Sequence, residues 1–425
     1  MNKLINRFFS NDYVFSIISR IMSVVIGVFH AAFLARFLGP ELKGIAATIT
    51  STVAVSSIVI SCGIHQAFPY YKKNDNSKEF LNKFCSNILM LYTVLFCVSL
   101  VALFVNSLGV VEKASLILTP VFAYEKIINY VFLVEASKKR NLVNLISSLI
   151  ETLLLFVFLI TINPNNIIMV VSISVSIALR ALISTIKVGF VFTFKSLNLK
   201  YLLGLFKFGL LPMLALLLTG LNSRVDILML NAYNVPAAYI GIYSVGVGLA
   251  EKALIIPDAI REILLGKLVK GKNLDEVARA CRIGTFFSFC ITIFVLLFGR
   301  IVIDVLFGEA YTSAYNITLI SAAGTIFMVY IKMVSQYNIV YNKQKTNALL
   351  LLLSVVTNIV LNAILIPKIG IVGAAISTFV GHFISGISFL IFYSKVTKMS
   401  IGRIVLLQIN DFDYLKSLFI TSKKK

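Results

Sequence analysis

The stretch TNALLLLLSVVTNIVLNAILIP, residues 346–367, carries no charged side chain over 22 positions. A helix that crosses the hydrocarbon core of a bilayer needs about 20 such residues. Residues 81–111 repeat the pattern with a single charge, Lys83. Because lipid offers no hydrogen bonds to a backbone, only helices and closed barrels cross it, and continuous apolar runs are typical of helices. The stretch therefore predicts an all-α integral membrane protein.

The composition of the whole chain points the same way. Of its 425 residues, 59% are hydrophobic and 13% are charged, whereas soluble proteins carry roughly 25% charged residues. The length rule predicts about twelve transmembrane helices. We expect them near residues 13–36, 44–67, 84–110, 114–136, 142–162, 165–190, 203–231, 236–260, 283–307, 312–338, 346–366 and 370–394.

Lysine and arginine are spread unevenly over the segments between these spans. Most of the 39 basic residues lie on the side that the N-terminus shares, as in 138–140, 261–282 and from 395 onward. Cytoplasmic loops carry such an excess, so we expect a multi-pass protein of the bacterial inner membrane with both termini cytoplasmic. The net charge of +21 then reflects orientation and attraction to anionic membrane lipids, and we expect no nucleic-acid partner.

Two short patterns occur twice. Residues 134–141 resemble 340–347, and residues 37–44 resemble 233–241. These offsets predict an N-terminal six-helix lobe, 1–200, a C-terminal six-helix lobe, 201–396, and a basic, amphipathic cytoplasmic tail, 397–425. Because each lobe has an even number of spans, the lobes insert in the same orientation and are related by a pseudo-two-fold axis along the membrane normal.

Several predicted spans carry polar residues at helical spacing. A charge inside a membrane faces the bundle interior or a wet cavity, because contact with lipid costs at least a few kcal/mol. The cations within the spans are Arg20, Lys126, Arg180, Lys187, Arg224, Lys252 and Lys332, and the acids are Glu125, Glu135, Glu151, Asp226, Glu251 and Asp258. Neighbouring charges can form internal ion pairs, hydroxyl stripes can join helices, and Lys187 and Lys332 can reach the membrane surface.

A cationic cavity suits an anionic substrate, since one arginine can donate two parallel hydrogen bonds to phosphate oxygens. Arg20 and Arg180 have no acidic neighbour within one helical turn and are the strongest candidates. The expected substrate-binding cations are Arg20, Arg180, Arg224 and Lys252. The expected polar cavity residues are Asn144, Ser148, Ser176 and Asn358, and the candidates for coupling a proton or cation are Glu151, Asp226 and Glu251, with His30 as a minor one.

The candidate motifs for an enzyme, a cofactor site or a metal site each lack a residue or a spacing that they require. Residues 266–272 have the spacing of a phosphate-binding loop, but Asn273 replaces the Ser or Thr that would bind magnesium. The five cysteines form no CxxC pair, and the three histidines lie on distant spans. We therefore expect a transporter that is not an enzyme and that holds no cofactor or metal.

The stretch LARFLGPELKG, residues 34–44, resembles the first outer turn of Wzx-type bacterial polysaccharide flippases. That group shares a superfamily with multidrug exporters of the MATE type. NSRVDILML at 222–230 and IGIYSV at 240–245 are similar to its seventh and eighth spans, and LFGEAY at 306–311 to the exit of its ninth.

The resemblance implies two six-helix lobes around a central cavity that opens to one side at a time. It also implies translocation of an undecaprenyl-diphosphate-linked oligosaccharide, typically an O-antigen unit, with the O-antigen polymerase and a chain-length regulator as partners. The main alternative is an ion-coupled multidrug exporter of the MATE type, which should have an acidic cavity. A MurJ-type lipid II flippase is expected to have two additional spans, and an O-antigen polymerase a large outer loop.

Overall fold

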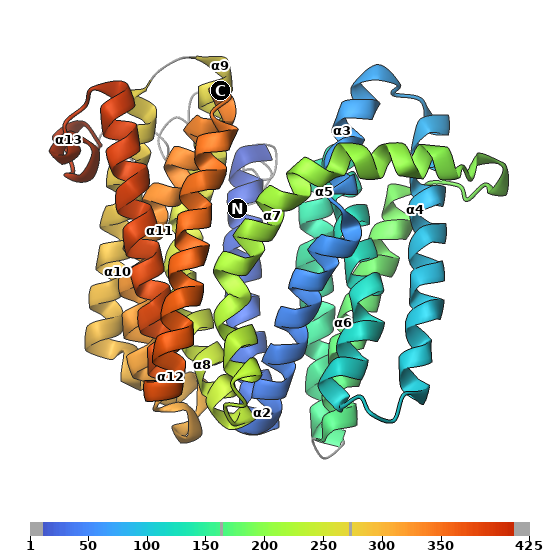
Figure 1. The fold of residues 1–425 in the computed structure, drawn as a ribbon, viewed down its shortest axis with the longest axis horizontal. Coiled ribbons are helices and arrows are strands. Elements are labelled where there is room, and N and C mark those ends of the chain that lie inside the picture. Colours follow the sequence, from blue (N-terminus) through green and yellow to red (C-terminus); the bar gives the residue numbers. More distant parts are fainter. Residues whose placement is uncertain (1–11, 162–164, 272–273, 412–425) are drawn as a thin grey trace, which may run out of the picture. The chain divides into compact units, whose positions relative to one another are not determined.

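The computed structural model describes residues 12–161, 165–271 and 274–411. Within these ranges the chain is helical almost throughout and contains no β-strand. Its contacts divide it into two compact units, Met1–Ser244 and Val245–Lys425, which we call unit 1 and unit 2 (Figure 1). The division of the sequence into repeats near residue 200, with a tail from 397, stays a prediction.

Within the described part of unit 1 there are six helices and the beginning of a seventh, joined by short turns. They are α2 (Asp12–Ser61), α3 (Ile64–Asn74), α4 (Lys78–Ser99), α5 (Val110–Thr161), α6 (Asn166–Val188), α7 (Leu199–Ala232) and the start of α8 (Ala237–Ala250), with 3₁₀ turns η1 (Leu100–Phe104) and η2 (Phe194–Ser196). Unit 2 holds the rest of α8, then η3 (Glu251–Leu254), α9 (Ile255–Lys270), α10 (Asp275–Phe307), η4 (Glu309–Tyr311), α11 (Ala314–Val340), α12 (Gln344–Thr397) and α13 (Ile401–Val405).

Among the described residues, nine helices are long and apolar enough to cross a membrane. Three of the longest helices are kinked where the sequence predicts a turn between two spans. The backbone leaves helical geometry at Gly39 in α2, at Ala136 in α5 and at Ile369 and Gly370 in α12. Dividing these helices at their kinks gives the twelve stretches expected from the sequence, so the predicted membrane-spanning all-α fold is confirmed.

Helix length explains why the kinks are needed. The 54 residues of α12 would extend for about 80 Å if straight, more than twice the hydrocarbon core of roughly 30 Å. Glycine provides the reversal in two cases, because Gly39 (φ 69°) and Gly370 (φ 57°) occupy a backbone region that other residues rarely adopt. Pro40 follows the first reversal, where its missing N–H falls at the start of a new helical segment.

The two copies of the motif at 37–44 and 233–241 pack against each other within unit 1. A Cβ atom on Gly44 would overlap the carbonyl oxygen of Ala237, and one on Gly241 would overlap that of Pro40. The contact is reciprocal, since each glycine also approaches the backbone nitrogen of the other. Reciprocal contacts of this kind arise when two copies of one motif are related by a two-fold rotation.

The long helix α7 changes direction along its course. Its 34 residues would measure about 51 Å if straight, again longer than a bilayer core. In Figure 1 its first part runs across the other helices of unit 1, and its later part runs beside them. Pro212 lies inside the helix, where proline removes a backbone hydrogen bond and bends the axis. The 21 residues from Pro212 to the end suffice for one span.

The C-terminal segment of unit 2 folds back onto the beginning of α10. Arg282 donates two hydrogen bonds to the Asp411 carboxylate, at 2.6 and 2.8 Å, and a third to the carbonyl of Arg403 at 2.8 Å. Both side chains are almost fully buried. Burial alone raises the pKa of Asp411, but hydrogen bonds from Arg282 and the Gln408 backbone and the charges of Arg282 and Arg279 outweigh it, so the pKa is lowered.

Candidate functional site

The second half of α5 presents the polar stripe predicted from the sequence. The Ser148 hydroxyl donates to the carbonyl of Asn144 at 2.9 Å, and the Thr152 hydroxyl donates to the carbonyl of Ser148 at 2.7 Å. Across the kink at Ala136, the Asn129 amide donates to the Asn144 side chain at 3.1 Å. The stripe is therefore an ordered ladder of hydroxyl and amide groups on one helix face.

An ion pair joins this stripe to α6. The Nε atom of Arg180 lies 3.0 Å from Oε1 of Glu151, and it also lies 3.4 Å from the carbonyl oxygen of Ser176. The Glu151 side chain is 7% exposed, whereas that of Arg180 is 37% exposed. The sequence identified both residues as candidates, but as a separate binding cation and coupling acid. The structure brings them together with Ser176, Asn144 and Ser148.

A second group of cations lies near this pair. The His30 ring on α2 lies 3.2 Å from the Thr152 hydroxyl, and it experiences the charges of both Lys43 and Arg180. Lys43 in turn experiences the charge of Arg224. Sequence reasoning assigned Lys43 to an outer turn and missed it as a site residue. The signal that could have found it is its position four residues after the reversal at Gly39. At that position Lys43 belongs to the next helical segment of α2 and not to a loop.

Asp226, predicted to couple an ion, makes a specific structural contact. One of its carboxylate oxygens accepts a hydrogen bond from the Tyr243 hydroxyl of α8, and the other accepts from the backbone N–H of Ile227 at 2.9 Å. Both side chains are buried. The sequence placed Asp226 beside Arg224 as a possible ion pair, whereas the contact found here ties α7 to α8.

The remaining predicted residues lie in unit 2 or outside the described side chains. Glu251 and Lys252 are half-buried on η3. Asn358 is fully buried between the two halves of α12, where its amide donates to the Thr378 hydroxyl at 3.0 Å. Arg20 lies in α2, but its side chain falls outside those that the structure describes.

Two lysines that the sequence expected to reach the membrane surface behave differently. Lys187 is exposed near the end of α6. The Nζ atom of Lys332 lies 2.7 Å from Asp258 of α9, which also faces Arg261 at 3.7 Å. Lys332 is thus held by an acid of a neighbouring helix. Sequence spacing could not reveal this pair, because its members are 74 positions apart.

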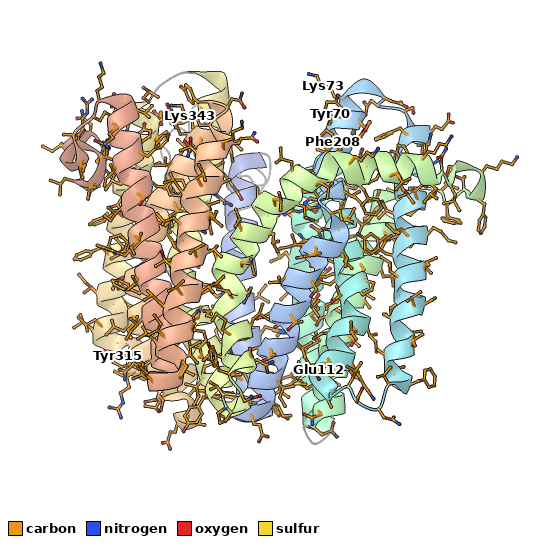
Figure 2. The ribbon with its side chains drawn as sticks, in the orientation of Figure 1. Tyr70, Lys73, Glu112, Phe208, Tyr315 and Lys343 are labelled. Atoms are coloured by element: carbon orange, nitrogen blue, oxygen red, sulfur yellow. The ribbon has the colours of Figure 1, made fainter. Side chains whose placement is uncertain are left out.

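Figure 2 labels residues near the two ends of each unit: Lys73 and Glu112 in unit 1, Lys343 and Tyr315 in unit 2. The Arg180–Glu151 pair lies on helices that run between the two ends of unit 1. Among the described residues, no group of three or more His, Cys, Asp and Glu side chains is placed to hold a metal ion. The candidate site is thus a hydrogen-bonded polar ladder on α5, with the Arg180–Glu151 ion pair beside it and the cations Lys43 and Arg224 nearby.

These features define a multi-pass helical membrane protein with charged residues built into its spans. The chain belongs to the polysaccharide biosynthesis protein family, whose model matches residues 11–256. It is 27% identical over 136 residues to the capsular polysaccharide biosynthesis protein CapF of Staphylococcus aureus. It is also 32% identical over 108 residues to an uncharacterized membrane protein of Methanocaldococcus jannaschii. The matched stretches are 31% and 25% of this chain, and 34% and 21% of those proteins.

Solved structures share the fold over nearly the whole chain. The lipid II flippase MurJ in an inward closed conformation matches 97% of this chain and 93% of its own, with a TM-score of 0.70 and 17% identity. An inward-facing multidrug resistance transporter of the MATE family, from the MOP superfamily, matches 92% of this chain and all of its own, with a TM-score of 0.67 and 11% identity. The chain therefore shares its fold with these two membrane proteins.

Proposed function

We propose that this protein is a flippase that moves a lipid-linked oligosaccharide across the bacterial inner membrane by alternating access. The cargo would be an undecaprenyl-diphosphate-linked repeat unit of a surface polysaccharide, either an O-antigen or a capsular unit. The family match and the capsular relative support the polysaccharide pathway, and the shared fold supports transport as the activity. Under this proposal the protein is not an enzyme, and both termini are cytoplasmic.

The Arg180 side chain is the observation that carries the proposal. Its contacts to described residues run through Nε, which leaves the two Nη groups to donate to phosphate oxygens. Guanidinium groups bind phosphate with two parallel hydrogen bonds, and a side chain that is 37% exposed is accessible to such a ligand. The cations Lys43 and Arg224, which lie within electrostatic range of each other, would help to neutralise the second phosphate.

The polar ladder would serve the sugar. Asn144, Ser148 and Thr152 offer hydroxyl and amide groups along one face of α5, and neutral groups of this kind hydrogen-bond sugar hydroxyls without fixing one sugar identity. Glu151 would exchange partners during transport: it pairs with Arg180 in the empty site and releases it when a diphosphate arrives. The coupled proton or cation would then compensate the buried carboxylate that Arg180 leaves, because an unpaired buried charge is costly.

The direct test is to delete the gene in its host and identify lipid-linked glycans by mass spectrometry. We expect one polyprenyl-diphosphate oligosaccharide to accumulate in the cytoplasmic leaflet, and expression of the wild-type protein to clear it. Arg180→Glu should fail to clear it while reaching the membrane in normal amounts. If no glycan accumulates and the deletion strain instead retains cationic drugs, the protein is a MATE-like exporter and the proposal is wrong.

A further inference from the structure

Exposed lysines gather on the segments at one end of unit 1. They are Lys73, Lys78, Lys195, Lys200 and Lys207, and the exposed acids of these same segments are Asp75 and Glu79. We call this region the basic end. Lys73 and Glu112 are labelled at opposite ends of the unit in Figure 2. The basic end therefore carries a local excess of positive charge that a polyanionic surface would attract.

The first part of α7 crosses the basic end and divides its outer surface into two stripes. With about 100° between successive residues, Leu199, Leu203 and Leu210 fall within about 40° of one another. They are 73%, 50% and 50% exposed. Lys200 and Lys207 form the next stripe around the helix, also exposed. A row of exposed leucines beside a row of lysines is typical of a helix that lies in the membrane interface.

Aromatic rings lie next to the leucine and lysine stripes, where the first part of α7 packs against α3. The Phe208 ring lies 5.0 Å from that of Tyr70 and 6.0 Å from that of Tyr71, and the Tyr71 and Tyr201 rings are 6.5 Å apart. The Lys83 ammonium lies over the Tyr201 ring at 5.0 Å. Figure 2 labels Tyr70, Lys73 and Phe208 close together at this end. Tyrosines and lysines of this kind concentrate at the level of lipid headgroups.

The crossing segment is held in place by contacts that have no part in the candidate site. The Asn87 side chain on α4 donates to the carbonyl of Ser196 and accepts from the N–H of Asn198, both at 2.9 Å. Farther along, Gly209 lies so close to Gly63 that a Cβ on either would overlap the backbone of the other segment. The stripes are thus fixed against the body of unit 1, and little conformational entropy is lost when a ligand binds them.

We propose that the basic end is a binding site for anionic glycerophospholipids. The leucine stripe would contact acyl chains, Lys200, Lys207 and Lys73 would bind the headgroup phosphate, and Tyr70 would lie at headgroup level. The leucines, the lysines and the tyrosine correspond to the hydrocarbon, the phosphate and the polar headgroup of a bilayer. This correspondence favours a lipid that stays in the membrane. This goes beyond the proposed function, because it concerns a resident lipid and holds whichever substrate the transport site accepts.

The test compares two triple variants of the purified protein in detergent micelles. One is Lys73→Gln, Lys200→Gln, Lys207→Gln at the basic end, and the matched control replaces three exposed lysines of unit 2, Lys345, Lys395 and Lys398, by Gln. Phosphatidylglycerol is titrated in while the thermal unfolding midpoint is recorded, with phosphatidylcholine as the neutral lipid. Each lysine near an anionic surface is worth about five-fold in binding. The basic-end variant should therefore need on the order of a hundred-fold more phosphatidylglycerol.

The wild type and the control variant should respond alike, and both responses should weaken in high salt. The proposal is overturned if the basic-end variant responds like the wild type, or if the control variant loses as much. It is also overturned if inorganic phosphate or phosphatidylcholine stabilises the wild type as well as phosphatidylglycerol does. Leu203→Ser provides an independent check. This variant keeps every charge, but it should weaken the response to phosphatidylglycerol because it removes an apolar contact to the acyl chains.

Discussion

Replacing Arg180 and Glu151 by glutamine, singly and together, tests whether their ion pair serves the substrate or only the fold. The two side chains differ in exposure, 37% for Arg180 and 7% for Glu151. Removal of the arginine leaves a buried carboxylate without its partner. Removal of the glutamate leaves a guanidinium that solvent already reaches. We therefore expect Arg180→Gln to destabilise the protein more than Glu151→Gln does.

The magnitude follows from the distance and the exposure. Two unit charges 3.0 Å apart attract by about 5 kcal/mol at an effective dielectric constant near 20, which is an upper bound. Loss of one partner of a fully buried pair costs about 3–5 kcal/mol. Because solvent screens the exposed arginine, we expect about 2 kcal/mol for Arg180→Gln and about 1 kcal/mol for Glu151→Gln. At about 1 °C per kcal/mol for a chain of 425 residues, the unfolding midpoint falls by about 2 °C in the first variant.

Two measurements on the same variants separate the roles. Thermal unfolding in detergent reports stability, and clearance of the accumulated lipid-linked glycan reports transport. The double variant, which is neutral at both positions, should recover most of the stability that Arg180→Gln loses, since no buried charge is left unpaired. It should remain inactive in transport, because the guanidinium that binds the diphosphate is gone.

Two outcomes would refute this reasoning. If the double variant regains transport together with stability, the pair is structural and Arg180 does not bind the cargo. If Glu151→Gln destabilises the protein more than Arg180→Gln does, exposure does not govern the cost of breaking the pair. The exchange Arg180→Glu with Glu151→Arg serves as the control, because it keeps the attraction but moves the cation to α5.

Three further predictions concern stability. Gly44→Val should abolish folded protein in membrane extracts, because its side chain would overlap the α8 backbone. Tyr243→Phe should lower the free energy of unfolding by about 1–3 kcal/mol, measured by thermal unfolding, because it leaves the buried carboxylate of Asp226 without this donor. The lowered pKa of Asp411 means that its pair with Arg282 stabilises the fold above the ordinary aspartate pKa and that this gain is lost as pH falls through the lowered value. The difference in unfolding midpoint between wild type and Asp411→Asn should thus be constant near neutral pH and shrink below about pH 4.

The sequence was sufficient for the fold because the length of an apolar run reports the thickness of the bilayer directly. It also predicted a turn at each of the three kinks, and glycine marks two of them, since Gly39 precedes a proline and Gly370 interrupts an apolar run. The kink at Ala136 carries no such residue. The bend of α7 was missed because residues 199–211 are as apolar as a span, and only the total helix length reveals that they exceed one crossing.

The candidate site was predictable as a set of residues but not as a set of contacts. Helical spacing places Asn144, Ser148 and Glu151 on one face because it describes a single helix. It cannot say which face of which other helix lies opposite. The ion pair from Glu151 to Arg180 joins residues of different helices, as does the pair from Lys332 to Asp258. Such pairs depend on packing between helices, which a single sequence does not record.

The tight turns at the kinks have a practical consequence for mapping the topology of this protein. At Gly39, Ala136 and Gly370 one span passes into the next through only one or two non-helical residues, so an epitope tag or reporter inserted there would separate two helical segments that need each other to fold. Single cysteines introduced near these positions, and tested with a membrane-impermeant thiol reagent, avoid that damage. The five native cysteines would first be replaced by alanine or serine, and each turn could then be assigned to one side of the membrane.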